Sequence, residues 1–213
     1  MHQSRAFVLE RRERREADQL VTLYTEEFGI LRTIASGVRK AGAKLRGHLE
    51  PPAKTEVTLV TGKQNYRLTG AILIDSFARI RKFLERRRAA EAAAAVLLRI
   101  FFQERDPRIW GALEEFFGAL DRESPLPARL CQQALFWFLI RALAILGYHA
   151  SLDGMFSRMP RLRALFLKYE SEDISRALDI SLPPSALRVI GRALQKSFEA
   201  HTGQHFAFLT KVD

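Results

Sequence analysis

The chain has 213 residues, of which 47% are hydrophobic and 27% are charged. This composition is typical of a packed globular protein, so extensive disorder is excluded. The chain carries 34 Lys and Arg against 24 Asp and Glu, a formal charge of +10, which favours a polyanionic partner. A single cysteine excludes an internal disulfide framework and any zinc site that needs several cysteines, and it fits a reducing compartment.

Neither a membrane span nor a secretion signal is expected. The most apolar stretch, residues 134–148, covers 15 residues and contains Arg141, whereas a span needs about 20 apolar residues. Residues 1–15 have no apolar core followed by a small-residue cleavage site. We therefore expect a cytoplasmic protein.

The first third of the chain has the pattern of short strands. The expected strands are residues 6–9, 20–25, 30–38, 57–61 and 66–69, with a hairpin turn at residues 62–65. No helical segment of 10–15 residues alternates with them, which disfavours a parallel βαβ sheet. The pattern predicts a small β-barrel domain over residues 1–77.

Beyond residue 77 the apolar residues follow helical spacing. The expected helices are residues 81–103, 109–120, 128–146 and 184–202. Asp106 and Pro107 are typical of a helix start, and Gly147 and Gly203 of helix ends. Residues 128–146 are apolar nearly all round, so this helix is expected at the centre. The sequence thus predicts an α+β protein with an all-α domain over residues 78–213.

Basic residues gather in three segments, residues 29–48, 79–88 and 158–168. The first contains an expected loop after a strand, with several cations and no acidic residue. Such a loop can follow a phosphate backbone without reading base sequence. The residues predicted to contact DNA are Arg11, Arg12, Arg39, Lys40, Lys44, Arg46, Arg81 and Lys82. A solvated surface is the alternative for each segment taken alone.

The last expected helix separates an apolar face from a basic one. The apolar face is expected to consist of Leu187, Ile190, Leu194 and Phe198. A second face carries three cations four residues apart, the basic stripe Arg188, Arg192 and Lys196. Like charges at this spacing repel slightly, so the stripe is a candidate phosphate-binding surface, and a solvated face is equally compatible with it.

The sequence contains no catalytic motif. Residues 61–63 (TGK) lack the first glycine and the following helix of a phosphate-binding loop. His201 and His205 are four residues apart, but Gly203 is expected to end the helix between them and no further ligand joins them. Cys131 opens an apolar helix without a nearby histidine, as a buried small residue does. The sequence therefore indicates a protein that is not an enzyme and has no metal and no cofactor.

Several segments resemble the bacterial DNA repair protein RecO. In the barrel half these are residues 6–9 (AFVL), 16–18 (EAD), 21–29 (VTLYTEEFG), 35–40 (ASGVRK) and 44–51 (KLRGHLEP). Residues 138–148, with Arg141 and a closing LGY, are similar to the central helix of the family, and residues 198–209 to its C-terminal end. The order and spacing of these segments together carry the resemblance nearly from end to end.

The resemblance implies an N-terminal OB-fold and a helical C-terminal domain. It also implies a recombination mediator that binds single- and double-stranded DNA, anneals complementary strands and helps RecR to load RecA. A further implied partner is the C-terminal tail of single-stranded-DNA-binding protein, which is acidic with an apolar end. We expect this tail to meet Arg141, Arg188, Arg192 and Lys196, with residues 136–138 as candidate apolar contacts.

The sequence departs from the family in two places. Many members have a four-cysteine zinc site after the central helix, where this chain has residues 152–157 (LDGMFS) without a cysteine. Zinc is therefore not expected. Leu139 stands where the central helix of the family usually has a glutamate, so any contact of that glutamate is in doubt here.

Two other functions remain compatible with the residues. An RNA-binding or ribosome-associated OB-fold protein would have the same barrel and charge. A helical scaffold with basic faces that bind acidic proteins is the third candidate. Few aromatic residues occur in the barrel half, and most follow strand patterns, so we expect DNA binding to be mainly electrostatic, with little stacking.

Overall fold

The computed structural model describes residues 1–14, 16–38, 43, 45–62, 66–100, 105–148 and 160–209. The chain forms two compact units. Unit 1 is Met1–Arg81 together with Phe101–Trp110, and unit 2 is Lys82–Ile100 together with Gly111–Asp213. The sequence pattern divided the chain at residues 77 and 78 and so placed Phe101–Trp110 with the helices. Nothing in that pattern indicates that this segment belongs to unit 1.

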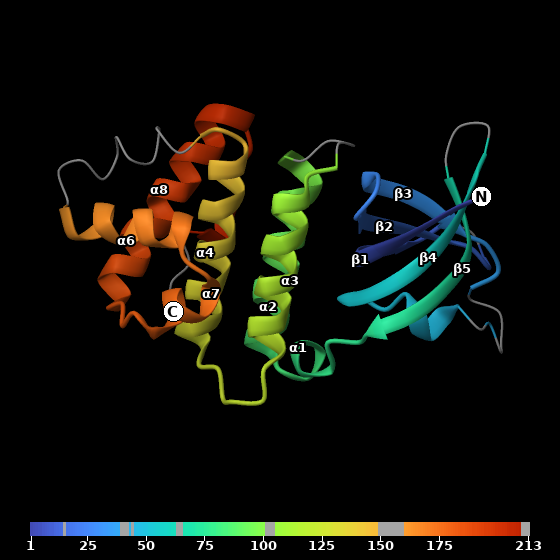
Figure 1. Ribbon diagram of the computed structural model, residues 1–213, viewed down its shortest axis with the longest axis horizontal. Helices are drawn as coiled ribbons and strands as arrows, with labels where there is room; N and C mark the ends of the chain where they lie inside the picture. Colours follow the sequence, from blue (N-terminus) through green and yellow to red (C-terminus); the bar gives the residue numbers. More distant parts are fainter. Residues whose placement is uncertain are drawn as a thin grey trace. The chain divides into compact units, whose positions relative to one another are not determined.

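Unit 1 contains a closed five-stranded barrel (Figure 1). The strands are β1 (His2–Glu13), β2 (Gln19–Thr25), β3 (Gly29–Ala35), β4 (Ala53–Thr61) and β5 (Tyr66–Asp75), and a 3-10 helix η1 (Arg46–His48) lies between β3 and β4 in sequence. Their order around the barrel is β1-β2-β3-β5-β4. Strands β3 and β5 pair in parallel and the other neighbours pair antiparallel. The predicted N-terminal OB-fold barrel is confirmed.

Alternating apolar side chains fill the barrel. The fully buried inward residues include Ala6, Val8, Val21, Leu23, Val57 and Leu59. Strand β1 is longer than the sequence pattern predicts, because it continues past a bulge between Val8 and Glu10 as far as Glu13. Residues 10–13 still pair with β2 although they are charged, since backbone pairing does not require an apolar side chain on the outward face.

The barrel closes through a short contact between β3 and β5. Two residue pairs join these strands, Ile34 with Arg67 and Ala35 with Leu68. Further along β5, the Leu73 N–H donates to Nδ1 of His48 at 3.1 Å. Helix η1 thus supplies a hydrogen-bond acceptor to β5 beyond the part that pairs with β3. We call the side of the barrel formed by β3, η1 and β5 the seam face.

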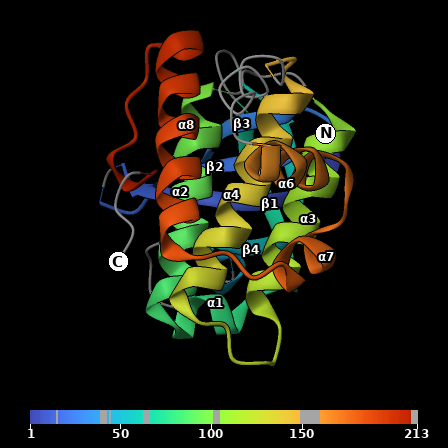
Figure 2. The same cartoon turned by 90° about the vertical axis from the view of Figure 1, so that its left-hand side faces the viewer.

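Unit 2 is helical, and α4 lies at its centre (Figure 2). The helices after the barrel are α1 (Ala78–Lys82), α2 (Leu84–Ile100), α3 (Pro107–Asp121), α4 (Ala128–Ile145), α6 (Pro160–Ser171), α7 (Ile174–Asp179) and α8 (Pro184–Thr202), followed by the 3-10 helix η2 (Ala207–Leu209). Helix α1 and the first turn of α3 belong largely to unit 1. Helix α4 packs against α2, α6, α7 and α8, which confirms the central position predicted for it.

The interior of α4 is almost entirely buried. Residues 133–140 have exposed fractions between 0% and 6%. By length and apolarity α4 is the one helix among the described residues that could cross a membrane, but 61% of its apolar window is buried inside the protein. This burial is that of a core helix.

The predicted helix ends are confirmed at two sites. The Asp106 carboxylate accepts a hydrogen bond from the Arg108 N–H at 2.8 Å, and Pro107 occupies the first position of α3. Gly203 ends α8 in the left-handed conformation with a φ of 66°. The helix predicted over residues 81–103 is wrong in its bounds, because it is divided into α1 and α2 around Phe83. Helices α6 and α7 were not predicted.

Candidate nucleic-acid interface

The second segment of unit 1 covers the outward side chains Phe7 of β1 and Tyr24 of β2. The Phe7 and Trp110 rings lie 4.7 Å apart between centroids. The Tyr24 hydroxyl donates to the Asp106 carbonyl at 3.2 Å, and burial raises the pKa of Tyr24 to about 12. Both Phe7 and Tyr24 are 1% exposed. A nucleic acid therefore has no access to Phe7 and Tyr24.

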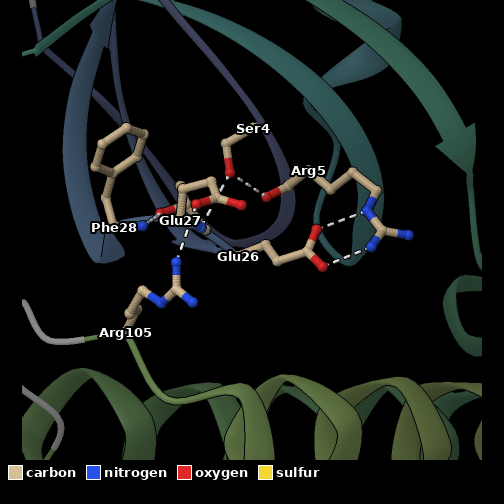
Figure 3. A network of polar contacts seen from close by, with 7 residues as sticks. Ser4, Arg5, Glu26, Glu27, Phe28 and Arg105 are labelled. Carbon is tan, nitrogen blue, oxygen red and sulfur yellow. Dashed lines mark hydrogen bonds and ion pairs between the residues drawn. The ribbon is translucent and has the colours of Figure 1, made fainter.

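The cations beside these covered side chains are neutralised within unit 1 (Figure 3). Arg5 makes two hydrogen bonds to the Glu26 carboxylate, at 2.6 and 2.5 Å. Arg105 contacts Glu27 at 3.1 Å. The turn that carries both glutamates is fixed by the Glu27 N–H, which donates to the Ser4 hydroxyl at 3.3 Å. These arginines hold the turn and the second segment in place, so we do not assign them to a ligand.

The seam face presents cations without counterions. Arg32 on β3 and Arg67 on β5 are exposed. The pairing of Ile34 with Arg67 places Arg67 beside β3, two residues along from Arg32. Arg46 is exposed on η1, which reaches β5 through His48. In the part of the chain that the structure describes, none of these three arginines takes part in an ion pair.

Apolar side chains accompany the cations of the seam face. Ile72 and Ile74 on β5 are 66% and 49% exposed. From Arg67 to Leu73 the strand advances by six residue steps, about 20 Å. A single strand of nucleic acid that follows β5 would thus meet charge at Arg67 and apolar surface at Ile72 and Ile74.

The sequence did not single out Arg32, Arg67, Ile72 or Ile74 as site residues. Alternation within β3 assigns Arg32 to the outward face, and this signal was available from the sequence. In β5, Arg67 and Ile72 are an odd number of residues apart and are both exposed, because the pairing of β5 with β4 shifts register between them. Simple alternation would have placed these two residues on opposite faces. The parallel pairing of β3 with β5 joins positions more than 30 residues apart, and the sequence pattern did not predict it.

Three of the predicted DNA-binding residues, Arg39, Lys40 and Lys44, lie outside the described residues. Arg46 is exposed, as the prediction requires. Arg11 and Arg12 each have a carboxylate partner.

The two pairs on β1 differ in exposure. Arg11 pairs with Glu50 at 2.7 Å, and 20% of its side chain is exposed. Arg12 pairs with Glu10 at 2.7 Å, and 69% of its side chain is exposed. A phosphate could displace the exposed pair at little cost, whereas Arg11 is largely enclosed.

The second predicted basic segment contains a structural arginine. Arg81 is half-buried, and Lys82 is exposed with its ammonium 5.6 Å from the Phe83 ring centre. Arg86 is 3% exposed, and its guanidinium donates to backbone carbonyls of unit 2. The charge of Arg86 is therefore used inside unit 2 and is not offered to a ligand.

Of the predicted partner-binding residues, Arg141 is used inside unit 2, whereas the basic stripe is exposed. The Arg141 guanidinium donates to the Glu170 carbonyl at 2.8 Å and lies 5.2 Å from the Trp137 ring centre, so it holds α4 to the end of α6. Residues 136–138 are fully buried and offer no apolar contact to a partner. The basic stripe on α8 is exposed. Its assignment to a partner stays a prediction.

An aromatic cluster packs against the barrel core. The His2 ring contacts Phe28 and Tyr66 edge-on, with centroid distances of 5.5 and 5.9 Å. Phe28 and Tyr66 are half-buried and pack against the barrel core, whereas His2 is exposed. Of the barrel aromatics, these are the ones a base could reach.

The cysteine and histidines that were considered as catalytic or metal-binding residues are buried or held by neighbouring side chains. Burial raises the pKa of the Cys131 thiol to about 11. His205 Nδ1 lies 2.5 Å from the Glu199 carboxylate, and the His201 and Tyr148 rings are in contact, with centroids 4.2 Å apart. Among the described residues, no group of three or more His, Cys, Asp or Glu is placed to hold a metal ion.

The family model and the curated relatives that match this chain point to the same family. The family model for "Recombination protein O N terminal" matches residues 1–77, which is the barrel. A DNA repair protein RecO of Dehalococcoides mccartyi is 31% identical over 170 residues, covering 79% of this chain and 65% of the relative. A DNA repair protein RecO of Geobacter metallireducens is 32% identical over 149 residues, covering 70% of this chain and 59% of the relative. The chain thus spans less than two thirds of the length of these curated relatives.

Proposed function

We propose that this chain, which belongs to the RecO family, is a recombination mediator of DNA repair that binds single- and double-stranded DNA and anneals complementary strands. The proposal includes help in loading RecA together with RecR, and contact with the C-terminal tail of single-stranded-DNA-binding protein, in the cytoplasm. The observation that carries it is the similarity to DNA repair proteins named RecO, which extends over 70–79% of the chain.

The chemistry of the seam face supports electrostatic binding of a nucleic-acid backbone. Arg32, Arg46 and Arg67 are exposed on β3, η1 and β5, whereas the aromatic side chains Phe7 and Tyr24 on β1 and β2 are buried. Each phosphate neutralised on a single strand contributes about 0.7 to the slope of log K against log salt concentration. The basic residues Arg39, Lys40 and Lys44 lie between β3 and η1 in sequence and are proposed to extend this contact.

This arrangement suits annealing because it does not depend on base sequence. Cations that hold the backbone leave the base edges free to pair with a second strand. Ile72 and Ile74 add apolar contact to bases without reading them, since they lack hydrogen-bonding groups. A protein that bound base edges tightly would oppose the pairing that annealing requires.

The seam face is tested by a double substitution, Arg32→Gln with Arg67→Gln. We expect weaker single-strand binding and a salt slope smaller by about 1.4, because two phosphate contacts are lost. The matched control is Arg105→Gln with Arg108→Gln, which removes the same charge from cations already paired with Glu27 and Asp106. Fluorescence anisotropy of a labelled oligonucleotide between about 50 and 200 mM salt, the range over which such contacts are lost, measures both slopes.

The basic residues between β3 and the start of η1 are tested separately, by replacing Arg39, Lys40, Lys44 and Arg46 with Ala. The slope should fall by up to about 3, since at most four contacts are lost. If both this variant and the seam variant keep the wild-type slope, DNA does not bind to the barrel.

The function itself is tested by annealing of two complementary oligonucleotides, with and without single-stranded-DNA-binding protein. We expect faster annealing with the wild-type chain and a smaller effect for the seam variant. A competition titration of unlabelled RNA against unlabelled DNA distinguishes the proposed function from the alternative, an RNA-binding OB-fold protein. That alternative requires unlabelled RNA to displace the labelled strand at a lower concentration than unlabelled DNA of equal length.

A further inference from the structure

Helix α8 carries a row of cations with no function in the packing of unit 2. Its apolar face, predicted from the spacing, is buried, with Leu187, Ile190, Leu194 and Phe198 between 1% and 3% exposed. The basic stripe Arg188, Arg192 and Lys196 is exposed on another face, and α8 runs along one side of unit 2 (Figure 2). The stripe therefore contributes charge to the surface and nothing to the core.

The stripe has no counterion of its own. No acidic residue occurs between positions 180 and 198. In the described part of the chain, none of the three cations takes part in an ion pair or hydrogen bond. Glu199, the next acidic residue, is occupied elsewhere: hydrogen bonds from His205 and Gln195 lower the pKa of its carboxyl. Like charges four residues apart repel one another on a helix, so this surface favours an external anion.

The spacing of the stripe selects an extended anion. Four residues of helix advance about 6 Å along the axis, so the three cations form a row about 12 Å long. Such a row can be matched by a polymer that repeats a negative charge every few ångströms, as a phosphate backbone does. A single bound phosphate or carboxylate would leave two of the three cations unpaired.

The surroundings of the stripe argue against an acidic peptide with an apolar end. Such a peptide needs an apolar pocket beside the cations, and residues 136–138 are fully buried. Arg141, which was predicted to border that pocket, is bound to the Glu170 carbonyl. In the described part of unit 2 the exposed large apolar side chains are Phe83, Leu84 and Leu167, none of which is on α8.

We propose that the basic stripe of α8 is a second binding site for a nucleic-acid strand, which it holds by its phosphates without reading its sequence. This inference rests on the proposed function, in which the barrel of unit 1 holds a first strand. One chain with a site in each unit would bring two strands together, which is the physical requirement for annealing.

The test is the triple substitution Arg188→Gln, Arg192→Gln and Lys196→Gln in the full chain. The probe is a single-stranded oligonucleotide of about ten nucleotides, within the range that one such site covers. Wild-type protein should bind two oligonucleotides per chain and the triple variant one. For the wild-type chain, the slope of log K against log salt for the second binding event should be about 2 in magnitude, since the stripe neutralises three phosphates.

The matched control removes three other exposed cations of unit 2, by Arg129→Gln, Arg161→Gln and Lys168→Gln. It should bind two oligonucleotides, because net charge alone does not form the site. Circular dichroism melting of each variant checks that the fold is intact.

Any of the following outcomes would overturn the inference. If the wild-type chain binds only one oligonucleotide, or if the triple variant still binds two, the stripe is not a nucleic-acid site, while DNA binding by the barrel stands. If the triple variant binds two oligonucleotides but loses an acidic tail peptide, the stripe is a peptide receptor. If the wild-type chain binds none, the proposed function itself fails.

Discussion

The backbone of Gly191 in α8 lies too close to its neighbours to carry a side chain. A Cβ at this position would stand 2.0 Å from the Leu209 carbonyl oxygen and 3.2 Å from the Phe136 ring. This close approach allows η2 and α4 to pack against α8.

The replacement Gly191→Ala should therefore destabilise the protein, by about 1–3 kcal/mol, since either α8 or η2 must move. Gly118→Ala is the matched control, because Gly118 is an exposed position of α3 where an added Cβ would have no neighbour within 4 Å. The control should gain about 0.5–1 kcal/mol from helix propensity. Urea unfolding followed by circular dichroism measures both, and equal midpoints for the two variants would contradict the packing argument.

The Cys131 thiol is 2% exposed, and burial raises its pKa to about 11. At about pH 8 the native thiol should react with a thiol reagent on the order of a hundredfold more slowly than in the unfolded chain, because the thiolate is the reactive form. Since the folded pKa lies above the ordinary value, the thiol's contribution to stability is complete below about pH 8.5 and is lost as the pH rises toward 11. Equal rates in native and denatured protein would mean that Cys131 is accessible.

At the scale of elements, Arg86 joins α2 to the end of α3. Its guanidinium donates to the carbonyls of Leu120, Arg122 and Ser124 at 2.8–2.9 Å. Carbonyls at and beyond the end of a helix lack helical partners, and one planar guanidinium with several fixed donors can satisfy three of them at once.

The replacement Arg86→Lys should cost about 3 kcal/mol of unfolding free energy, because an ammonium cannot reach all three carbonyls and leaves buried acceptors unpaired. Arg87→Lys is the control: its side chain is 48% exposed, and we expect a change within about 0.5 kcal/mol. A thermal melt that gives the same midpoint for Arg86→Lys and wild type would show that the buried guanidinium is dispensable.

At the scale of the whole molecule, the chain should fold without zinc. The single cysteine is buried in α4, and a structural zinc site of the cysteine-rich type needs several thiolates. Elemental analysis of the purified protein should find less than stoichiometric zinc, and a chelator should leave the melting temperature unchanged to within about 1 °C, since metal binding contributes strongly to stability wherever it is structural. Zinc at one atom per chain would contradict this prediction.

The elements with local signals could be located from the amino-acid sequence alone. Alternation of apolar residues located the strands of the barrel, and the helical spacing of Leu187 and Ile190 located the buried face of α8. Asp106 and Gly203 marked helix ends because capping depends on a few neighbouring residues. The same helical spacing placed the basic stripe on a different face from the buried one.

Which cations are free depends on the tertiary structure. Arg86 and Arg88 are two residues apart in one basic run, yet Arg86 is buried under carbonyls more than 30 residues away and Arg88 is exposed. Likewise the pairing of β3 with β5 and the cover that Trp110 gives to Phe7 join distant parts of the chain. Such contacts depend on how the elements close in space, and a local pattern of charge or hydrophobicity carries no information about that closure. The physical reason is that periodicity fixes which face of an element is apolar, whereas the partner of that face is chosen by packing over the whole unit.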